Sequence, residues 1–309
     1  MPKDNARPEA AISVEKDPGH MTRRRLLGHA AAGGLLAAAG FTTGLRAAPD
    51  EAKKSPAAPS GKIKQSACRW CYSKVPLDDL AKHCAEIGLK SVELLGPDDF
   101  ATVKKHGLTC AMVLSHSIHP GLNDKKNHDS CLGLMRKRIG EAAEAGFPSV
   151  ICFSGNREKI PDDVGIENCA LALKKIVGFA EEKKITLCME LLNSKVDHKD
   201  YQCDRTPWGV EIVKRVGSPR FKLLYDIYHM QIMEGDVIRT IRQYHEYIGH
   251  YHTGGNPGRH EIDDTQELNY AAVMRAIAET GYEGYVGQEF IPTREPIASL
   301  RQAFDICNV

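Results

Sequence analysis

Residues 221–231 read FKLLYDIYHMQ, and this stretch decides the fold. The apolar run at its start predicts a buried strand, with Asp226 where that strand ends and His229 on the turn beyond it. Three further apolar runs end on a side chain that can bind a metal: 186–189 on Glu190, 248–251 on His252 and 285–288 on Glu289. Such endings on successive strands indicate a divalent metal site in a barrel enzyme.

The rest of the chain alternates short apolar runs with longer amphipathic segments. The predicted strands span 63–67, 91–94, 109–114, 149–153, 186–191, 222–226, 248–252 and 285–289. The predicted helices span 77–87, 100–106, 131–145, 168–183, 208–216, 237–244, 270–279 and 297–307. Eight strand–helix units in about 250 residues favour one (β/α)8 TIM barrel of the α/β class over an open doubly wound sheet. No GxGxxG motif follows the first strand, which argues against dinucleotide binding.

The first 48 residues predict a targeting segment. Arg23-Arg24-Arg25 precedes an apolar, Ala- and Gly-rich run at 26–41, as in a Tat-type signal peptide. This run is shorter than the ~20 residues that span a bilayer, although an uncleaved membrane anchor and a start at Met21 remain alternatives. We therefore expect a signal peptide at 1–48, a linker at 49–61 and a catalytic domain at 62–309, with export to the periplasm and no membrane span in the mature body.

Charge and cysteine content restrict the partner and the redox chemistry. The chain carries a net charge of +1, but its first 48 residues hold seven of the 41 basic and four of the 40 acidic residues, so the remainder has a net charge of −2. That balance argues against a nucleic-acid partner and favours a small molecule. All ten cysteines follow residue 48, several inside apolar runs where Cys acts as a small buried hydrophobe, and we expect them to be structural or incidental. The sequence leaves open whether any of them pair.

The candidate metal ligands occupy the last four predicted strands. The active site of a TIM barrel lies at the carboxyl ends of its strands, where Glu190, Asp226, His252 and Glu289 stand. Three carboxylates and one imidazole suit Mg²⁺, Mn²⁺, Co²⁺ or Zn²⁺.

The final third of the chain resembles the hydroxypyruvate isomerases of the xylose-isomerase-like barrel superfamily. The resemblance is carried by LLYDIYHMQIME at 223–234, NPGRHE at 256–261, ELNY at 267–270 and GQE at 287–289, and it extends more loosely back to residue 62. It implies that Glu190 and Glu289 bind the metal and exchange protons with the substrate, while Asp226 and His252 complete the ligand set. It also implies that His229 and Arg259 contact substrate oxygens.

The implied reaction is the isomerisation of hydroxypyruvate, or of a related small sugar or keto acid, by proton transfer through an enediolate. His252 stands where hydroxypyruvate isomerases often carry Gln and epimerases of the superfamily carry His, so a ketose 3-epimerase is an alternative. An exported sugar-binding barrel without catalysis is another. We interpret Lys195, His198 and His116 as ordinary loop or strand-end residues, and a position facing the pocket is the alternative for each. A homo-oligomer is possible.

Overall fold

The computed structural model describes residue 61 and residues 63–309. The predicted signal peptide at 1–48 and nearly all of the predicted linker at 49–61 lie outside the described residues. Within the described part of the chain, no helix combines the length and the apolar character that a membrane crossing requires.

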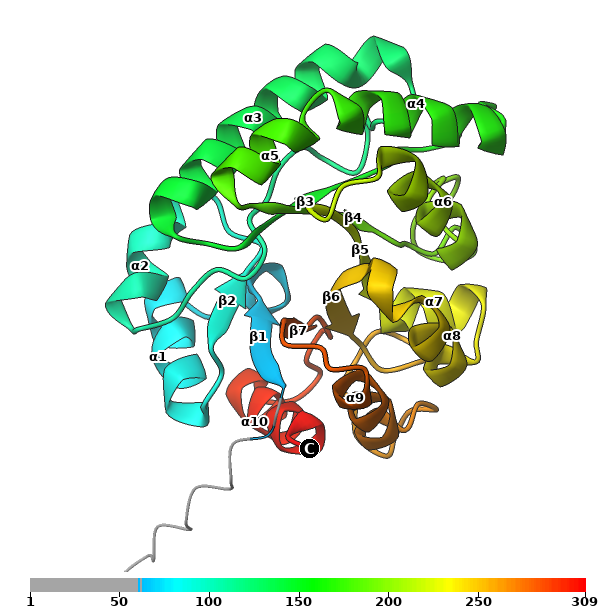
Figure 1. Cartoon of the computed structure of the whole chain (residues 1–309). Coiled ribbons are helices and arrows are strands. Elements are labelled where there is room, and N and C mark those ends of the chain that lie inside the picture. Colours follow the sequence, from blue (N-terminus) through cyan, green and yellow to red (C-terminus); the bar gives the residue numbers. More distant parts are fainter. Residues whose placement is uncertain (1–60, 62) are drawn as a thin grey trace, which may run out of the picture. The chain divides into compact units, whose positions relative to one another are not determined.

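Seven parallel strands form one curled sheet, with helices around its outside (Figure 1). The strands are β1 (Lys64–Cys68), β2 (Ser91–Glu93), β3 (Ser149–Cys152), β4 (Thr186–Glu190), β5 (Phe221–Asp226), β6 (Ile248–Thr253) and β7 (Tyr285–Gln288). Their order in the sheet is β2-β1-β7-β6-β5-β4-β3. The strands are almost entirely buried, as expected where helices cover the outer face and side chains fill the interior.

The segment at 109–113 lies between β2 and β3 and closes the ring, at the position of a predicted strand of the barrel. Its backbone bonds to both neighbours: Leu94 N donates to Met112 O at 2.8 Å and Val113 N donates to Ser149 O at 2.9 Å. The prediction of a regular strand at 109–114 is nevertheless wrong, because this segment makes only isolated bridges. One reason is that Ala111 N donates to the Ser91 hydroxyl instead of a backbone carbonyl, which interrupts the ladder.

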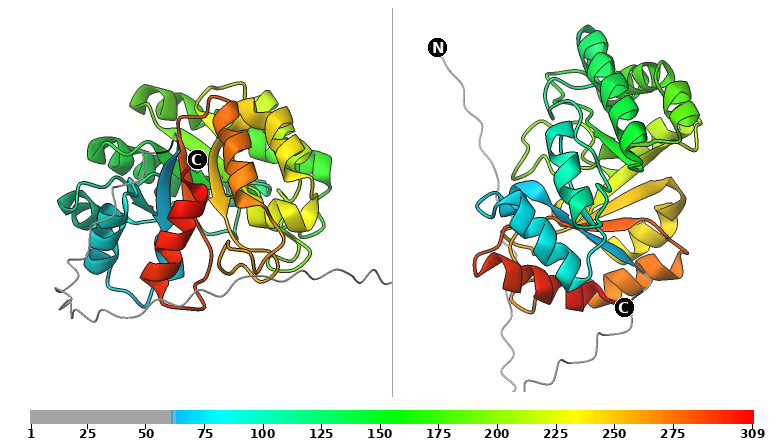
Figure 2. Two further views of the ribbon diagram at one scale, coloured as in Figure 1. Left: turned by 90° about the horizontal axis from the view of Figure 1, so that it is seen from below. Right: turned by 90° about the vertical axis from the view of Figure 1, so that its left-hand side faces the viewer.

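The helices lie outside the ring in each of the views (Figures 1 and 2). They are α1 (Leu77–Ile87), α2 (Phe100–Lys105), α3 (His128–Ala145), α4 (Asp162–Lys174), α5 (Val177–Lys183), α6 (Thr206–Val216), α7 (Ile227–Met233), α8 (Val237–Tyr244), α9 (Tyr270–Glu279) and α10 (Pro296–Cys307). The single helix predicted at 168–183 is in fact α4 and α5, which break at residues 175–176. None of the ten cysteines forms a disulfide, and nine of them are buried.

Helix α7 was not predicted, and it changes the setting of His229. Asp226 ends β5 and is also the N-cap of α7, where its side chain accepts a hydrogen bond from His229 N at 3.1 Å. An N-cap carboxylate satisfies one of the unpaired N–H groups of the first helical turn. His229 is therefore held in a helix against Asp226 rather than on a free turn.

The loop after β7 is held in place by Glu261, which is buried. Its carboxylate accepts hydrogen bonds from Thr293 N at 2.9 Å, Thr293 Oγ1 at 2.8 Å and Ser299 Oγ at 2.8 Å. Burial opposes ionisation of Glu261, but these hydrogen bonds lower its pKa to about 2. Glu261 thus ties the loop that follows Glu289 to α10.

This arrangement predicts a specific acid sensitivity. Because the pKa of Glu261 is lower in the folded than in the unfolded chain, its contribution to stability is complete above about pH 4.5 and is lost as the pH falls toward 2. Glu261→Gln should reduce the free energy of unfolding at pH 7 by about 2 kcal/mol and by much less near pH 2.5. Urea denaturation at both pH values measures this difference. An equal loss at both would contradict the account.

Candidate active site

The four predicted metal ligands converge at one end of the barrel. Glu190 is the last residue of β4, Asp226 the last of β5, His252 lies in β6 and Glu289 directly follows β7. One ligand atom from each lies within 4.8 Å of the others, and all four residues are buried. The convergence follows from the parallel sheet, in which neighbouring strands end at the same rim.

His252 faces two of the carboxylates through one ring nitrogen. Its Nδ1 atom lies 2.8 Å from Glu289 Oε2 and 3.3 Å from Glu190 Oε1. Burial disfavours the imidazolium form, yet the negative neighbours, Glu289 among them, raise the pKa of His252 well above its usual range. The raised pKa favours the imidazolium form, whose positive charge would lie between the two glutamates.

The surroundings shift the pKa values of the three carboxyl groups in different directions. Burial and the charge of Glu289 raise the pKa of Glu190. Burial also raises the pKa of Asp226 well above its usual range, against the pull of Arg259. For Glu289 burial acts in the same direction, but the charges of His252 and Arg259 outweigh it and hold the pKa well below its usual range. Three carboxylates buried this closely are ionised together only beside compensating positive charge, so the donor set fits a divalent cation.

Arg259 supplies part of that positive charge. Its Nη2 atom lies 2.7 Å from Glu289 Oε2 and 3.3 Å from Asp226 Oδ2. The guanidinium also lies over the rings of Trp70, at 5.0 Å, and Tyr228, at 5.3 Å. Its Nε atom is buried and has no hydrogen-bond partner among the described residues. Arg259 therefore keeps an unused donor beside the carboxylates.

His229 is buried and held as one tautomer. Asn193 Oδ1 accepts from the backbone N–H groups of Val196 and Asp197, so its Nδ2 atom faces His229 Nδ1 at 2.6 Å. An amide nitrogen only donates, so Nδ1 accepts and the ring proton lies on Nε2. Burial, reinforced by the charge of Arg259, lowers the pKa of His229 well below its usual range. The neutral ring leaves a buried Nε2 donor without a hydrogen-bond partner in the described structure.

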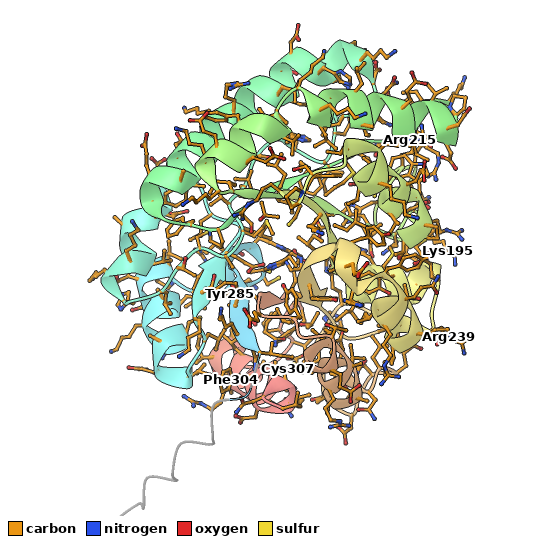
Figure 3. All side chains as sticks on the ribbon, viewed as in Figure 1. Lys195, Arg215, Arg239, Tyr285, Phe304 and Cys307 are labelled. Atoms are coloured by element: carbon orange, nitrogen blue, oxygen red, sulfur yellow. The ribbon has the colours of Figure 1, made fainter. Side chains whose placement is uncertain are left out.

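A cavity of about 400 Å³ opens onto Glu190, Glu289 and Arg259. Its remaining walls are mostly apolar, formed by Trp70, Leu94, Leu114, Ile118, Ile151, Phe153 and Leu192. His116 and His198 also line it, which is the alternative that the sequence left open for them. Lys195 behaves as an ordinary residue: it lies at the periphery of the barrel (Figure 3) and donates to the carbonyls of Ile232 and Met233.

Three residues that contact the site were not identified from the sequence. Trp70, in the 3-10 helix η1 (Arg69–Tyr72), donates its indole N–H to Glu289 Oε1 at 2.7 Å. Asn193 orients His229, as described above. Glu93 ends β2 and contacts His252, and it belongs with Cys68 and His252 to a second group of potential ligands. Of the three, only Glu93 could have been identified from the sequence, because it is a carboxylate next to the end of the strand predicted at 91–94.

Comparison with known proteins agrees with this geometry. Residues 81–307 match the family described as xylose isomerase-like TIM barrel, and the chain belongs to that family. The chain is 28% identical over 246 residues to the hydroxypyruvate isomerase of Escherichia coli, covering 70% of this chain and 88% of that protein. It is 26% identical over 250 residues to the 2-oxo-tetronate isomerase of Haemophilus influenzae, covering 74% and 93%. These relatives place the chain among the isomerases.

A solved structure shows the same fold. The D-psicose 3-epimerase of Clostridium cellulolyticum H10, determined with D-tagatose, superposes with a TM-score of 0.65 at 18% identity. The match covers 80% of this chain and all of that one. At this identity the likeness concerns the barrel alone.

The role of Arg259 as a buried counter-charge is testable. In the presence of a chelator, Arg259→Ala should lower the free energy of unfolding by about 3 kcal/mol, because Asp226 and Glu289 lose a buried partner. The matched control is Arg215→Ala, which breaks the exposed pair with Glu211 and should cost about 0.5 kcal/mol. Urea denaturation of both variants measures the difference. Equal losses would show that Arg259 is not a buried counter-charge.

Proposed function

We propose that this isomerase is metal-dependent and moves a carbonyl group between adjacent carbons of a small 2-oxo acid, with hydroxypyruvate as the first substrate to test. The observation that carries the proposal is the pairing of Glu190 and Glu289. They come from different strands, line the same cavity and share one buried group with Asp226 and His252. This is the constellation that removal and return of a proton beside a carbonyl requires.

Glu190, Asp226, His252 and Glu289 would hold the divalent ion, and three carboxylate oxygens with one imidazole suit Mg²⁺, Mn²⁺, Co²⁺ or Zn²⁺. When bound, such an ion supplies Lewis acidity that stabilises negative charge on the substrate oxygens. The protein's own groups perform the proton transfers.

For hydroxypyruvate, one glutamate removes a proton from C3. The C–H electron pair becomes the C2–C3 double bond, and the carbonyl π pair moves onto O2. The other glutamate then delivers a proton to C2, while the proton on O3 passes to O2 and leaves an aldehyde at C3. Each turnover moves one proton from the second glutamate to the first, so exchange with water restores the starting state.

The surrounding residues position the substrate and exclude water. Arg259 lines the cavity and has a buried Nε donor without a hydrogen-bond partner among the described residues, which suits the carboxylate or hydroxyl oxygens of a 2-oxo acid. His229 Nε2 is a second such donor, but it lies 3.6 Å from Asp226 Oδ2 and His229 is not part of the cavity wall, so its contact with the substrate stays a prediction. Trp70 covers Glu289 through its indole hydrogen bond, and the apolar cavity wall lowers the local dielectric. The hydroxypyruvate and 2-oxo-tetronate isomerases among the relatives both take 2-oxo acids by name, which supports this substrate class.

A ketose 3-epimerase is the second candidate, favoured by the cavity. A volume of about 400 Å³ with an apolar wall exceeds what a three-carbon acid fills. The extra space would take the remaining carbons of a free sugar, with the same two glutamates acting on opposite faces of C3. The position at which deuterium enters the substrate distinguishes the two reactions.

The proposal predicts the behaviour of the two glutamates in deuterium oxide. The metal-supplied protein should incorporate solvent deuterium into hydroxypyruvate at C3, detected by NMR. Glu190→Gln and Glu289→Gln should each lower this rate by at least about 100-fold, because an amide cannot exchange the proton. The control Glu211→Gln, on the exposed face of α6, should leave the rate unchanged.

Different outcomes separate the candidates. Exchange at C3 of a ketose, without exchange into hydroxypyruvate, would replace the isomerase proposal with the epimerase. A lack of exchange with hydroxypyruvate, 2-oxo-tetronate and a panel of free ketoses would overturn both. Activity that survives prolonged chelation would contradict the metal requirement.

A further inference from the structure

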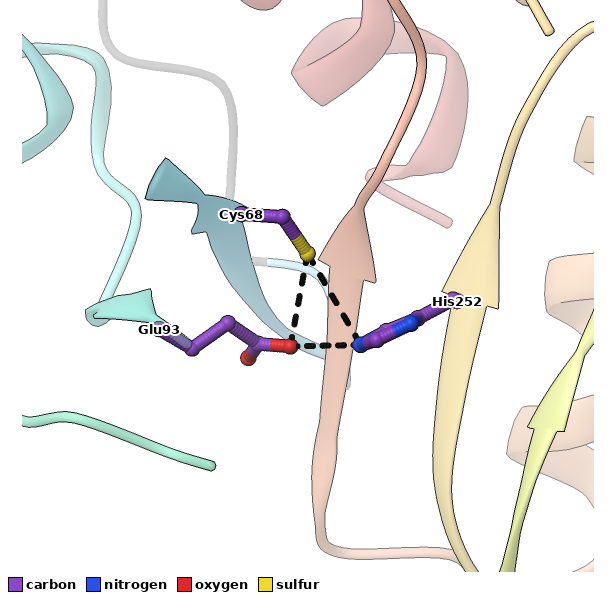
Figure 4. A group of neighbouring side chains, drawn as sticks. All are labelled: Cys68, Glu93 and His252. Carbon is purple, nitrogen blue, oxygen red and sulfur yellow. Dashed lines mark hydrogen bonds and ion pairs between the residues drawn. The ribbon is translucent and has the colours of Figure 1, made fainter. Parts of the chain in front are cut away.

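Glu93 is a buried carboxylate that the proposed reaction does not use. It is the last residue of β2, has no exposed surface and comes from the side of the barrel opposite β5. Its side chain reaches across the interior toward His252 on β6, with Cys68 of β1 beside both (Figure 4). A buried ionisable group needs partners whose interactions offset the free energy lost with its hydration.

Three donors meet on one oxygen of Glu93. His252 Nε2 lies 2.7 Å from Oε1, His250 Nε2 lies 2.9 Å from it, and the Cys68 thiol donates to it at 3.5 Å. The second oxygen, Oε2, has no hydrogen-bond partner within the described residues. A carboxylate only accepts hydrogen bonds, so the contact requires a hydrogen on Nε2 of both imidazoles.

The consequence for His252 concerns its other nitrogen. With the Nε2 hydrogen engaged by Glu93, Nδ1 is the nitrogen that gives up its hydrogen and offers a lone pair when the ring is neutral, and it is Nδ1 that faces Glu190 and Glu289. We propose that Glu93 is a positioning residue that fixes the tautomer and the ring orientation of His252, so that Nδ1 joins the three carboxylates as a metal ligand. This inference rests on the proposed metal site but not on the identity of the substrate.

The backbone of β7 supports the contact from one side. Gly287 passes so close that an added Cβ would lie 2.5 Å from Glu93 Oε1 and 2.8 Å from His252 Cδ2. A residue with a side chain would therefore push the carboxylate and the ring apart. The strand thus leaves space at this point for the hydrogen bond between them.

A second metal bound by Cys68, Glu93 and His252 is the competing interpretation. This group offers three ligand atoms, one fewer than the group at the strand ends. Its Glu93 oxygen also accepts from His250 Nε2 at 2.9 Å, and the separation of 2.7 Å from His252 Nε2 is typical of a charge-assisted hydrogen bond.

The test measures zinc affinity of the full chain by competition with a chromophoric chelator. Glu93→Leu should weaken Zn²⁺ binding about 10- to 100-fold, the usual effect of losing a carboxylate behind a histidine ligand. Glu93→Gln should stay within about threefold of the wild type, because its amide oxygen still accepts from Nε2. His250→Leu is the matched control: it removes the neighbouring hydrogen bond to Glu93 and should also stay within about threefold, since no ring nitrogen of His250 belongs to the ligand group.

A spectroscopic measurement reports the tautomer directly. In ¹⁵N-resolved spectra of the zinc-loaded wild type, His252 should carry its hydrogen on Nε2 and bind metal through Nδ1. The inference is overturned by a hydrogen on Nδ1, by wild-type affinity in a folded Glu93→Leu variant, or by equal losses in the Gln and Leu variants. Two zinc ions per chain, one of them lost in Cys68→Ser, would establish the second metal site instead. Neither readout uses turnover, so an inactive protein with the expected affinities would refute only the proposed reaction.

Discussion

Burial of three carboxylates at one rim of the barrel is the constraint on which the rest of the site depends. Glu190, Asp226 and Glu289 are buried, so water screens their charges little, and their mutual repulsion must be offset by positive charge. In this structure His252 and Arg259 supply it, through contacts of 2.8 and 2.7 Å with Glu289.

The barrel provides the geometry, and a few side chains outside the predicted ligand set refine it. Parallel strands place the ligands at one rim, and the N-cap of α7 links Asp226 to His229. Asn193 contacts His229, which lies against Asp226, and Glu93 contacts His252, which lies between Glu190 and Glu289. Such fixed donors and acceptors need little reorganisation when charge develops on a substrate, and this is how a protein stabilises an enediolate.

The strand-end positions could be predicted because they follow from local pattern and one topological rule. Glu190, Asp226 and Glu289 each follow an apolar run, and parallel strands end together. The contact between Glu93 and His252 joins residues 159 apart in sequence, and no local periodicity encodes it. Helix α7 was missed because no turn separates it from β5: Asp226 is both the last residue of the strand and the N-cap of the helix. The segment at 109–113 is irregular partly because Ala111 N donates to the Ser91 hydroxyl, and a run of apolar residues gives no indication of such a bond.

The most direct test of the central claim is anomalous diffraction from crystals grown with Mn²⁺ or Zn²⁺, collected at the absorption edge of the metal. The account predicts one ion within about 2.0 to 2.3 Å of oxygens of Glu190, Asp226 and Glu289 and of His252 Nδ1. Arg259 Nη2 should then have moved away from Asp226, since the ion replaces its charge. The absence of an anomalous peak at this site, with Arg259 still bonded to both carboxylates, would contradict it.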